Sequence, residues 1–498
     1  MRQLILFRAG GRFIIGSHLR LARHALLPAS PTMLSIHARG PRLCDGLTRR
    51  EWMRIGSLGL GGLTLPDLLR SRANASPVKQ GSFGKAKSVI VIWLTGGAPQ
   101  HETWDPKPEA PAEVRGAFGT IASKTPGLNV GELMPLTAKL TDKIAVLRTL
   151  STGDNAHSSS GYQMLTGVPH IPLSLENAKP QKPNDAPSLN ALVRALRPSD
   201  AGLPPAVTLP RHLANVGDMV WPGQGGGFLG RKFDPWQLTC DPADAKFTVP
   251  GCELPEDLTQ LRLDRRLSFL SQINQKLDSV EREESLRRYG QQSEQAIELL
   301  AGGKARTAFH LSEESTATRD RYGRTSFGQS VLLARRLVEA GTSLVQINWP
   351  RIEGKENLGG WDTHKQHNAS LKGWLMPIMD QTYSALIEDL SDRGLLDETL
   401  VCWMSEFGHT PKFNGNAGRD HWGKVFSIAL AGGGVQGGVV HGKTDRMAAE
   451  ATSDVVRPAD YLATIFHCLG YEPETMVKDQ QNRPIPISRG RVVHEVLG

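Results

Sequence analysis

The sequence contains few cysteines and, beyond its first residues, no long apolar run. Five cysteines among 498 residues exclude a small, disulfide-dense scaffold. No segment after residue 75 approaches the roughly 18 consecutive apolar residues that a membrane helix needs. We therefore expect no stable membrane span in the mature chain.

The main part of the chain also lacks an excess of basic charge. The whole sequence has 58 Lys+Arg and 50 Asp+Glu residues, a net charge of +8 and a pI near 9.2. Residues 1–75 hold twelve arginines and three acids, which leaves residues 76–498 with a net charge of −1. Because nucleic-acid binding needs a basic folded surface, we expect no nucleic-acid partner.

The basic leader, residues 1–75, has the features of a twin-arginine export signal. Arg49 and Arg50 precede a weakly apolar, Gly-rich run over residues 55–69, and Ala73-Asn74-Ala75 is a small-residue cleavage site. This order predicts export to the periplasm or the extracellular space, with the twin-arginine translocase as a partner. The alternative is an amphipathic surface helix. Met33 is a second candidate for the first residue of the chain.

Two cysteines flank a Pro/Asp-rich loop in the middle of the chain. Cys240 and Cys252 enclose "DPADAKFTVPG", and in an oxidising compartment a bridge between them would stabilise the loop by about 3 kcal/mol in the chain-entropy model. The alternative is two unpaired thiols, because spacing alone does not establish the geometry of a disulfide.

Short apolar runs that alternate with helical patterns predict an α/β fold. The runs expected as buried strands are residues 89–94, 143–150, 344–349, 400–404 and 426–431. Amphipathic helices are expected at 326–341, at 371–390 with a disturbance at Pro377, and at 458–469. Strands that alternate with helices favour a mainly parallel central sheet.

Residues 76–498 are predicted to form one domain with two insertions. Residues 176–256 are rich in Pro, Gly and Asn and have little periodicity, so we expect a long excursion over the surface. Residues 257–325 are strongly charged with apolar residues three and four apart, which predicts solvated amphipathic helices.

Acids and histidines gather after two of the predicted strands. Because ligands bind at the carboxyl ends of the strands in open α/β sheets, these side chains are expected to converge in one crevice. Carboxylate and imidazole donors favour Zn²⁺, with Mn²⁺ or Ca²⁺ as alternatives. Taken singly, each histidine is more typical of a structural role. The candidates are Asp362, His364, His367, Glu406, His409, Asp420 and His421.

Two further segments are candidate parts of the same crevice. The first strand ends in Gly96-Gly97 and is followed by Glu102 and Asp105, which are candidate metal ligands or ordinary surface charges. "STGDNAHSSSGYQMLTG" follows the second strand and predicts an N-capped helix whose positive end favours an anion. His157 and Ser158 at that end are the candidate catalytic residues, and N-capping is the competing explanation for the serine.

The ordered motifs of the chain resemble those of a known exported family. They are "WLTGGAPQHETWDPKP", "AHSSSGYQMLTG", "SFGQSVLLARRLVEAG", "GGWDTH", "SEFGHTP", "GRDHW" and "RPADYLATIFHCLG". Together with the leader they resemble the family called domain of unknown function fifteen-oh-one, over nearly all of residues 48–475. That family is similar to the alkaline phosphatase and sulfatase superfamily.

The resemblance implies a three-layer α/β/α fold with one or two metal ions at the strand ends. The superfamily's nucleophile position falls on His157, next to Ser158, and its first-strand carboxylate falls near Gly96. Glu406 takes the place of the usual acid and Phe407 that of the usual histidine. Asp362 with His364 or His367 resembles the middle ligand pair, and Asp420-His421 the element that supplies the last histidine.

Two classes of function follow from these observations. The first is an exported metal-dependent hydrolase of phosphate or sulfate esters, acting on a small anionic ester or on a sulfated or phosphorylated glycan. The second is a non-catalytic protein on the same fold, which binds an anion or a glycan or has a structural role.

Overall fold

The computed structural model describes residues 81–498, except 198–202, 246, 250–306 and 351–359. These residues belong to one compact unit, Lys79–Gly498. The predicted leader, Cys252 and most of the predicted helical insertion lie outside the described residues. Cys240 carries a free thiol in the structure, which gives the predicted disulfide no support.

The core of the molecule is an eight-stranded, mainly parallel sheet in the order β14-β4-β13-β10-β1-β9-β5-β8. β13 is antiparallel to both of its neighbours, and the other adjacent pairs are parallel. The bounds are β1 Ser88–Trp93, β4 Ile144–Leu150, β5 Ala206–Leu209, β8 Trp236–Gln237, β9 Leu344–Asn348, β10 Thr399–Met404, β13 Phe426–Ala431 and β14 Val440–His441. All five predicted strands are therefore present, with ends within one residue of those predicted.

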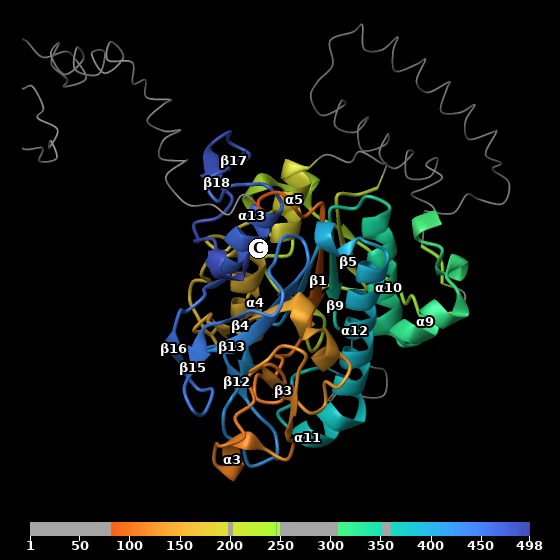
Figure 1. The fold of residues 1–498 in the computed structure, drawn as a ribbon. Coiled ribbons are helices and arrows are strands. Elements are labelled where there is room, and N and C mark those ends of the chain that lie inside the picture. Colours follow the sequence, from red (N-terminus) through yellow and green to blue (C-terminus); the bar gives the residue numbers. More distant parts are fainter. Residues whose placement is uncertain (1–80, 198–202, 246, 250–306, 351–359) are drawn as a thin grey trace, which may run out of the picture. The chain divides into compact units, whose positions relative to one another are not determined.

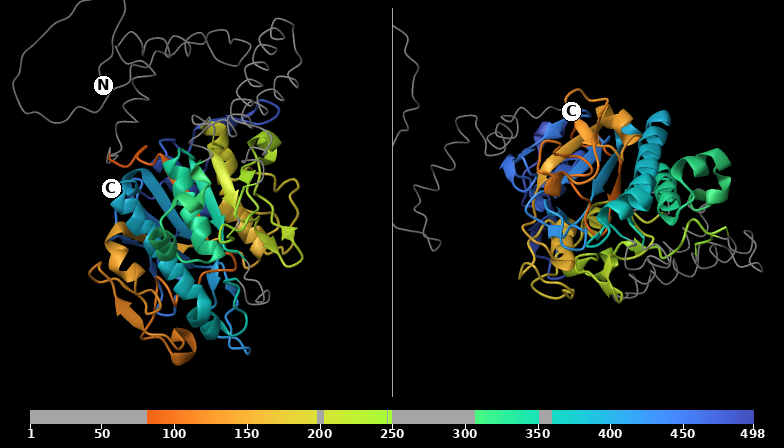
Figure 2. Two further views of the ribbon diagram at one scale, coloured as in Figure 1. Left: turned by 90° about the vertical axis from the view of Figure 1, so that its right-hand side faces the viewer. Right: turned by 90° about the horizontal axis from the view of Figure 1, so that it is seen from below.

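Helices cover both faces of the sheet, which confirms the predicted three-layer α/β/α fold (Figures 1 and 2). Alternate residues of β1 point to opposite faces: Ile90 and Ile92 belong to one apolar core, and Val89 and Val91 to the other. The first core is completed by α10 (Ser326–Glu339) and α12 (Met376–Asp392). The second is completed by α4 (His157–Thr166), α5 (Leu189–Leu196) and α13 (Pro458–Cys468).

Shorter elements surround these layers. The strands are β2 Thr120–Ala122, β3 Asn129–Gly131, β6 Ala214–Asn215, β7 Met219–Val220, β11 Gly408–His409, β12 His421–Trp422, β15 Lys443–Thr444, β16 Ala451–Ser453, β17 Met476–Lys478 and β18 Pro484–Pro486. The helices are α3 Ala112–Arg115, α9 Thr316–Tyr322 and α11 His367–Ser370. Within the described residues, no helix is both long and apolar enough to cross a bilayer.

The expected disturbance at Pro377 takes the form of a π-helical turn. Residues Leu371–Leu375 form this turn between α11 and α12, and Pro377 lies at the start of α12. Because proline has no N–H to donate to the preceding turn, the regular α-helical bonding begins only at that point.

Residues 176–256 differ from the predicted surface excursion, because part of them enters the sheet. They contribute α5, β5 and β8, and β5 pairs with β9 as an interior strand. The four residues of β5 lie between Pro205 and Pro210, so the apolar run was too short to be recognised as a strand. The remainder includes the β6–β7 hairpin.

Candidate metal centre

Polar residues that follow three strands meet at one edge of the sheet. β1, β4, β9 and β10 run in the same direction, so their carboxyl ends lie together. His157 begins α4 after β4, Asp362 and His364 follow β9, and Glu406 follows β10. His421 lies on β12, which pairs with β11 beside these ends.

Asp362 is the centre of this group, because three imidazoles face its carboxylate. Oδ1 of Asp362 lies 2.9 Å from Nε2 of His421 and 3.0 Å from Nε2 of His364. Oδ2 lies 3.3 Å from Nε2 of His157. The side chains of His157 and His421 are 13% and 14% exposed, whereas that of His364 is 40% exposed. The side chain of Asp362 is also 40% exposed, so these four residues, the Asp362 cluster, are open to solvent at Asp362 and at His364.

Each histidine of the Asp362 cluster is held by its other ring nitrogen, Nδ1. The partners are Oε1 of Glu406 for His157 at 2.8 Å, Oδ1 of Asp420 for His364 at 2.6 Å, and the main-chain oxygen of Asn155 for His421 at 2.7 Å. A histidine that donates from Nδ1 to an oxygen has its ring orientation fixed and presents Nε2 to a cation. All three rings of the cluster have this arrangement.

Glu406 is hydrogen-bonded to Nδ1 of His157, on the side of the ring away from Asp362. Its carboxylate is fully buried, and it accepts hydrogen bonds from the indole N–H of Trp93 at 2.9 Å and from the main-chain N–H of Gly96 at 2.7 Å. The sequence predicts Glu406 as a direct ligand beside Asp362. In the structure His157 lies between the two carboxylates, and Glu406 is hydrogen-bonded to its imidazole.

Gly96 allows the first strand to approach the Asp362 cluster closely. A Cβ atom at this position would lie 2.2 Å from the main-chain nitrogen of Asp362, and φ of Gly96 is +114°. The resemblance places a carboxylate of the superfamily near Gly96. In this chain the position supplies a main-chain N–H to Glu406 instead.

The charges of the Asp362 cluster stabilise one another. Burial alone would raise the pKa of Asp362, but hydrogen bonds from His157, His364 and His421 hold that pKa well below its usual range. Burial would lower the pKa of His157, yet hydrogen bonds to Asp362 and Glu406 raise it to about 10. The hydrogen bond to Asp362, assisted by Asp420, raises the pKa of His364 to about 9.

Two predicted ligands, Glu102 and His367, form a separate buried group. Oε1 of Glu102 lies 2.6 Å from Nη2 of Arg419, and Oε2 lies 3.4 Å from Nε2 of His367. Burial would raise the pKa of Glu102, but the Arg419 charge holds it below its usual range. The buried His409 lies next to His367, with ring centroids 5.4 Å apart. A guanidinium therefore already neutralises the carboxylate that was expected to hold a metal.

Asp105 and Ser158 also have partners away from Asp362. Asp105 lies 2.9 Å from Nζ of Lys107 and 3.3 Å from Nε of Arg148. The hydroxyl of Ser158 donates to the carbonyl of Leu175 at 3.1 Å and accepts from the N–H of Ala178 at 3.2 Å. Asp105 thus forms ion pairs, and Ser158 fixes the loop after α4.

Three residues that support the site were not among the sequence candidates. Trp93 donates to Glu406, the carbonyl of Asn155 holds His421, and Glu176 accepts the main-chain N–H of His157 at 2.6 Å. Glu176 also lies close enough to His157 and His421 for the three to share an ion. The position of Trp93 at the end of a strand was a usable signal. The sequence contains no comparable signal for Asn155 or Glu176.

The donor set of the Asp362 cluster fits a divalent metal ion. Asp362, His364 and His421 place ligand atoms within 4.8 Å of one another. In a tetrahedral zinc site with bonds near 2.05 Å, adjacent ligand atoms lie about 3.3 Å apart, and the distances from Asp362 to the three imidazoles are 2.9–3.3 Å. Two imidazoles and a carboxylate are the ligands of many catalytic zinc sites.

Fold and cluster together define a three-layer α/β protein with a candidate metal site at the carboxyl edge of a mainly parallel sheet. The chain belongs to the family described as "Protein of unknown function (DUF1501)", whose model matches residues 86–497. This confirms the resemblance seen in the motifs. No curated protein is significantly similar to this chain in sequence.

Solved structures with similarity to the chain include three hydrolase or synthase structures. The phosphonate monoester hydrolase SpPMH from Silicibacter pomeroyi is 13% identical, with 82% of this chain and 76% of that one covered and a TM-score of 0.34. The lipoteichoic acid synthase LtaP from Listeria monocytogenes is 11% identical, with 85% and 79% covered and a TM-score of 0.35. The PsFucS1 sulfatase from Pseudoalteromonas sp. is 15% identical, with 80% and 70% covered and a TM-score of 0.31.

Proposed function

We propose that this protein is an exported metal-dependent hydrolase of phosphate or sulfate esters. One observation carries the proposal: three imidazoles present Nε2 to the carboxylate of Asp362, and each is fixed at Nδ1 by an oxygen. Metal-binding histidines are held in this way by carboxylates and carbonyls. The nitrogen and oxygen donors favour zinc, with Mn²⁺ or Ca²⁺ as alternatives.

The degree of burial assigns different roles to the three histidines. His157, His421 and Asp362 would hold the ion, since both of these imidazoles are largely buried. A bound divalent ion supplies Lewis acidity, which acidifies water and stabilises negative charge on ester oxygens. His364 is exposed and is backed by Asp420, so it is placed to give a proton to the oxygen of the leaving group.

The position of Ser158 favours hydrolysis without a covalent intermediate. Its buried hydroxyl holds the chain at Leu175 and Ala178 and is not free to attack an ester. The same observation supports the second candidate, a non-catalytic anion- or glycan-binding protein, because a site without a side-chain nucleophile can also retain its ligand unchanged.

Metal analysis joined to a turnover assay tests the proposal. Wild-type protein should contain close to one divalent ion and should cleave an aryl phosphate or an aryl sulfate until a chelator is added. Asp362→Ala and His421→Ala should lose both metal and turnover. His310→Ala, at a half-exposed histidine near Glu313, is the matched control and should keep both.

The outcomes separate the two candidate functions. Bound metal without turnover of either ester would favour the non-catalytic alternative. Wild-type metal content in folded Asp362→Ala and His421→Ala proteins would contradict the metal site itself.

A further inference from the structure

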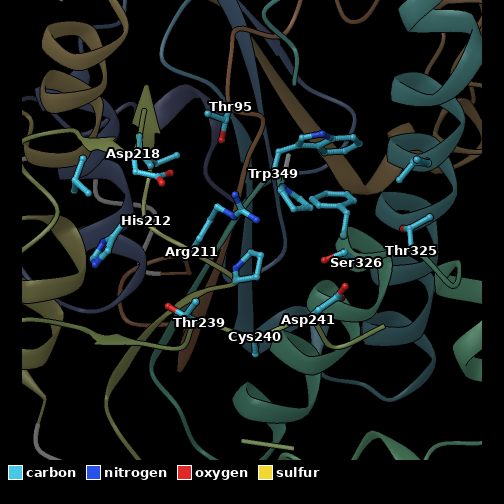
Figure 3. Close-up of a pocket in the computed structure, with 17 residues that line it drawn as sticks. Thr95, Arg211, His212, Asp218, Thr239, Cys240, Asp241, Thr325, Ser326 and Trp349 are labelled. Carbon is cyan, nitrogen blue, oxygen red and sulfur yellow. The ribbon is translucent and has the colours of Figure 1, made fainter. Parts of the chain in front are cut away.

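A large pocket opens at the same edge of the sheet as the Asp362 cluster. Its volume is about 830 Å³, which is within the range of sites that enclose small molecules. Figure 3 shows its wall, which includes the segment after β5, the β6–β7 hairpin and the first residues of α10. None of the residues predicted as catalytic or metal-binding lines it.

The pocket and the Asp362 cluster are joined by neighbouring residues. Thr95 lines the pocket and precedes Gly96, whose α-carbon packs against the main chain of Asp362. In the ladder between β1 and β9, Asn348 is the partner of Trp93, and Trp93 donates to Glu406. The wall of the pocket at Thr95 therefore lies beside the main chain that carries Asp362.

Arg211 is the cationic side chain of the pocket, and its main chain is held by buried amides. The side-chain N–H of Asn348 donates to the carbonyl of Arg211 at 2.7 Å, and Gln346 donates to Asn348 at 2.8 Å. Both amides are less than 4% exposed. Among the described residues the guanidinium has no ion-pair partner, and Figure 3 shows it projecting into the middle of the pocket. From this position it can contact an anionic group that enters the pocket.

The rest of the wall combines aliphatic side chains with Thr, Ser, Asp and His residues. Leu213, Val220 and Ile378 line the pocket. Val220, at the hairpin, is 41% exposed, whereas Leu213 is only 1% exposed. The aromatic residues of the wall, Phe327 and Trp349, are only 2% and 3% exposed. A sugar ring would stack on an open aromatic face, which these rings do not offer, whereas an alkyl chain gains from any apolar wall.

We propose that the pocket binds the aliphatic body of a monoanionic ester, with Arg211 contacting its oxyanion group. This inference rests on the proposed function and narrows its substrate class to amphiphilic phosphate or sulfate esters. Asp218 and Asp241 also line the pocket and repel an anionic ligand more strongly the more negative charges it carries. A heavily sulfated glycan is thereby disfavoured.

Binding of alkylphosphonates and alkylsulfonates, which cannot be hydrolysed as esters, tests the inference by calorimetry. For the full-length protein with its metal, affinity should rise from ethyl to octyl by up to about fourfold for each methylene that becomes buried. The phosphonate and sulfonate series show whether phosphate or sulfate is the preferred head group. Glucose 6-phosphate should bind at least tenfold more weakly than octylphosphonate.

Two variants locate the binding site. Arg211→Ala should weaken octylphosphonate binding by at least about tenfold, the usual effect of losing a hydrogen bond to a charged group. Val220→Ser should reduce the gain in affinity with chain length. Met476→Ser, at a residue that is 57% exposed on β17, is the control and should bind octylphosphonate as the wild type does.

The inference is overturned if affinity does not depend on chain length, if glucose 6-phosphate binds as tightly as octylphosphonate, or if Arg211→Ala binds normally. These readouts need no turnover. Alkylphosphonate binding without hydrolysis of any ester would contradict the proposed function alone. If an aryl ester is hydrolysed but the affinity for alkylphosphonates does not depend on chain length, the inference alone is contradicted.

Discussion

Gly96 and Asp362 lie so close together that a methyl group on the glycine would meet the main-chain nitrogen of the aspartate at 2.2 Å. The contact joins the end of β1 to the segment that follows β9. It also leaves the N–H of Gly96 free to donate to Glu406. One residue without a side chain therefore sets the distance between two parts of the site.

Gly96→Ala should lose the metal ion and about 3–5 kcal/mol of stability, because the new methyl overlaps main-chain atoms and φ is positive. Gly127→Ala is the matched control, since φ is +82° and nothing lies within 4 Å of the added Cβ. It should cost only about 1–2 kcal/mol and keep the metal. Urea unfolding and metal analysis measure both effects, and a Gly96→Ala protein with full metal content would contradict the prediction.

Ser158→Ala should retain turnover but lose about 1–3 kcal/mol, because the N–H of Ala178 loses its acceptor. Ser159→Ala is the control: its hydroxyl accepts from the N–H of Leu175 at 3.1 Å, so it should cost a similar amount. Steady-state kinetics and urea unfolding check both. A fall in kcat of several orders of magnitude for Ser158→Ala alone would identify that serine as the nucleophile.

His364→Gln should keep its metal and lose turnover by a factor of about 10²–10⁴, the usual contribution of a general acid. The reason is the exposed position of His364 against Asp420, on the open side of the cluster. His441→Gln, on β14, is the control for replacing a partly exposed histidine. Loss of metal to the extent seen in Asp362→Ala would show that His364 is a ligand instead.

Stability should fall as the pH falls below 6.5, in part because of His467. This ring is 2% exposed and its Nε2 lies 3.2 Å from Oγ of Ser82. Burial, assisted by the charge of His494, lowers its pKa to about 4. The unfolded chain takes up the proton first, so the stabilising effect is full above pH 6.5 and is lost towards pH 4.

Between pH 7 and pH 5 this group should remove about 2 kcal/mol from the free energy of unfolding. Urea unfolding of wild type and His467→Gln at both pH values checks the prediction. Between pH 7 and pH 5, the free energy of unfolding should fall by about 2 kcal/mol more in the wild type than in His467→Gln. Equal losses in the two proteins would show that His467 does not titrate in this way.

Export should require the paired arginines of the leader, because the translocase distinguishes guanidinium groups from lysine. Arg49→Lys together with Arg50→Lys should keep the uncleaved protein in the cytoplasm, whereas wild type should be cleaved after Ala75. Arg70→Lys with Arg72→Lys is the control and should be exported. Cell fractionation with mass spectrometry measures the location and the cleavage of each protein. Uncleaved wild-type protein in the cytoplasm would contradict the predicted export signal.

The sheet could be predicted from the sequence because its long strands are apolar on both faces. Runs such as Leu400–Met404 have no amphipathic alternative, and their ends follow from the polar residues beside them. β5 was missed because its four residues lie between two prolines. Its place in the sheet depends on pairing with β9, which is distant in sequence.

The segments that form the site could be predicted from the strands that they follow, but the direction of every side chain in them could not. Asp362, His364, His157 and His421 meet, as expected for side chains at the carboxyl ends of neighbouring strands. His367 does not join them, because it begins α11 and its Nδ1 lies 2.6 Å from Oγ1 of Thr363. The direction of a side chain at such a turn depends on contacts that spacing does not show.

The order in which the chain is made limits when the Asp362 cluster can form. Asn155 and His421, which are hydrogen-bonded, are separated by 266 positions. A nascent chain on the ribosome has His157 long before it has His421, and the cluster cannot be assembled until β12 has emerged and the sheet is nearly complete. A metal ion bound at this site would thus indicate a fully synthesised and folded chain, and truncated or misfolded chains would not bind it.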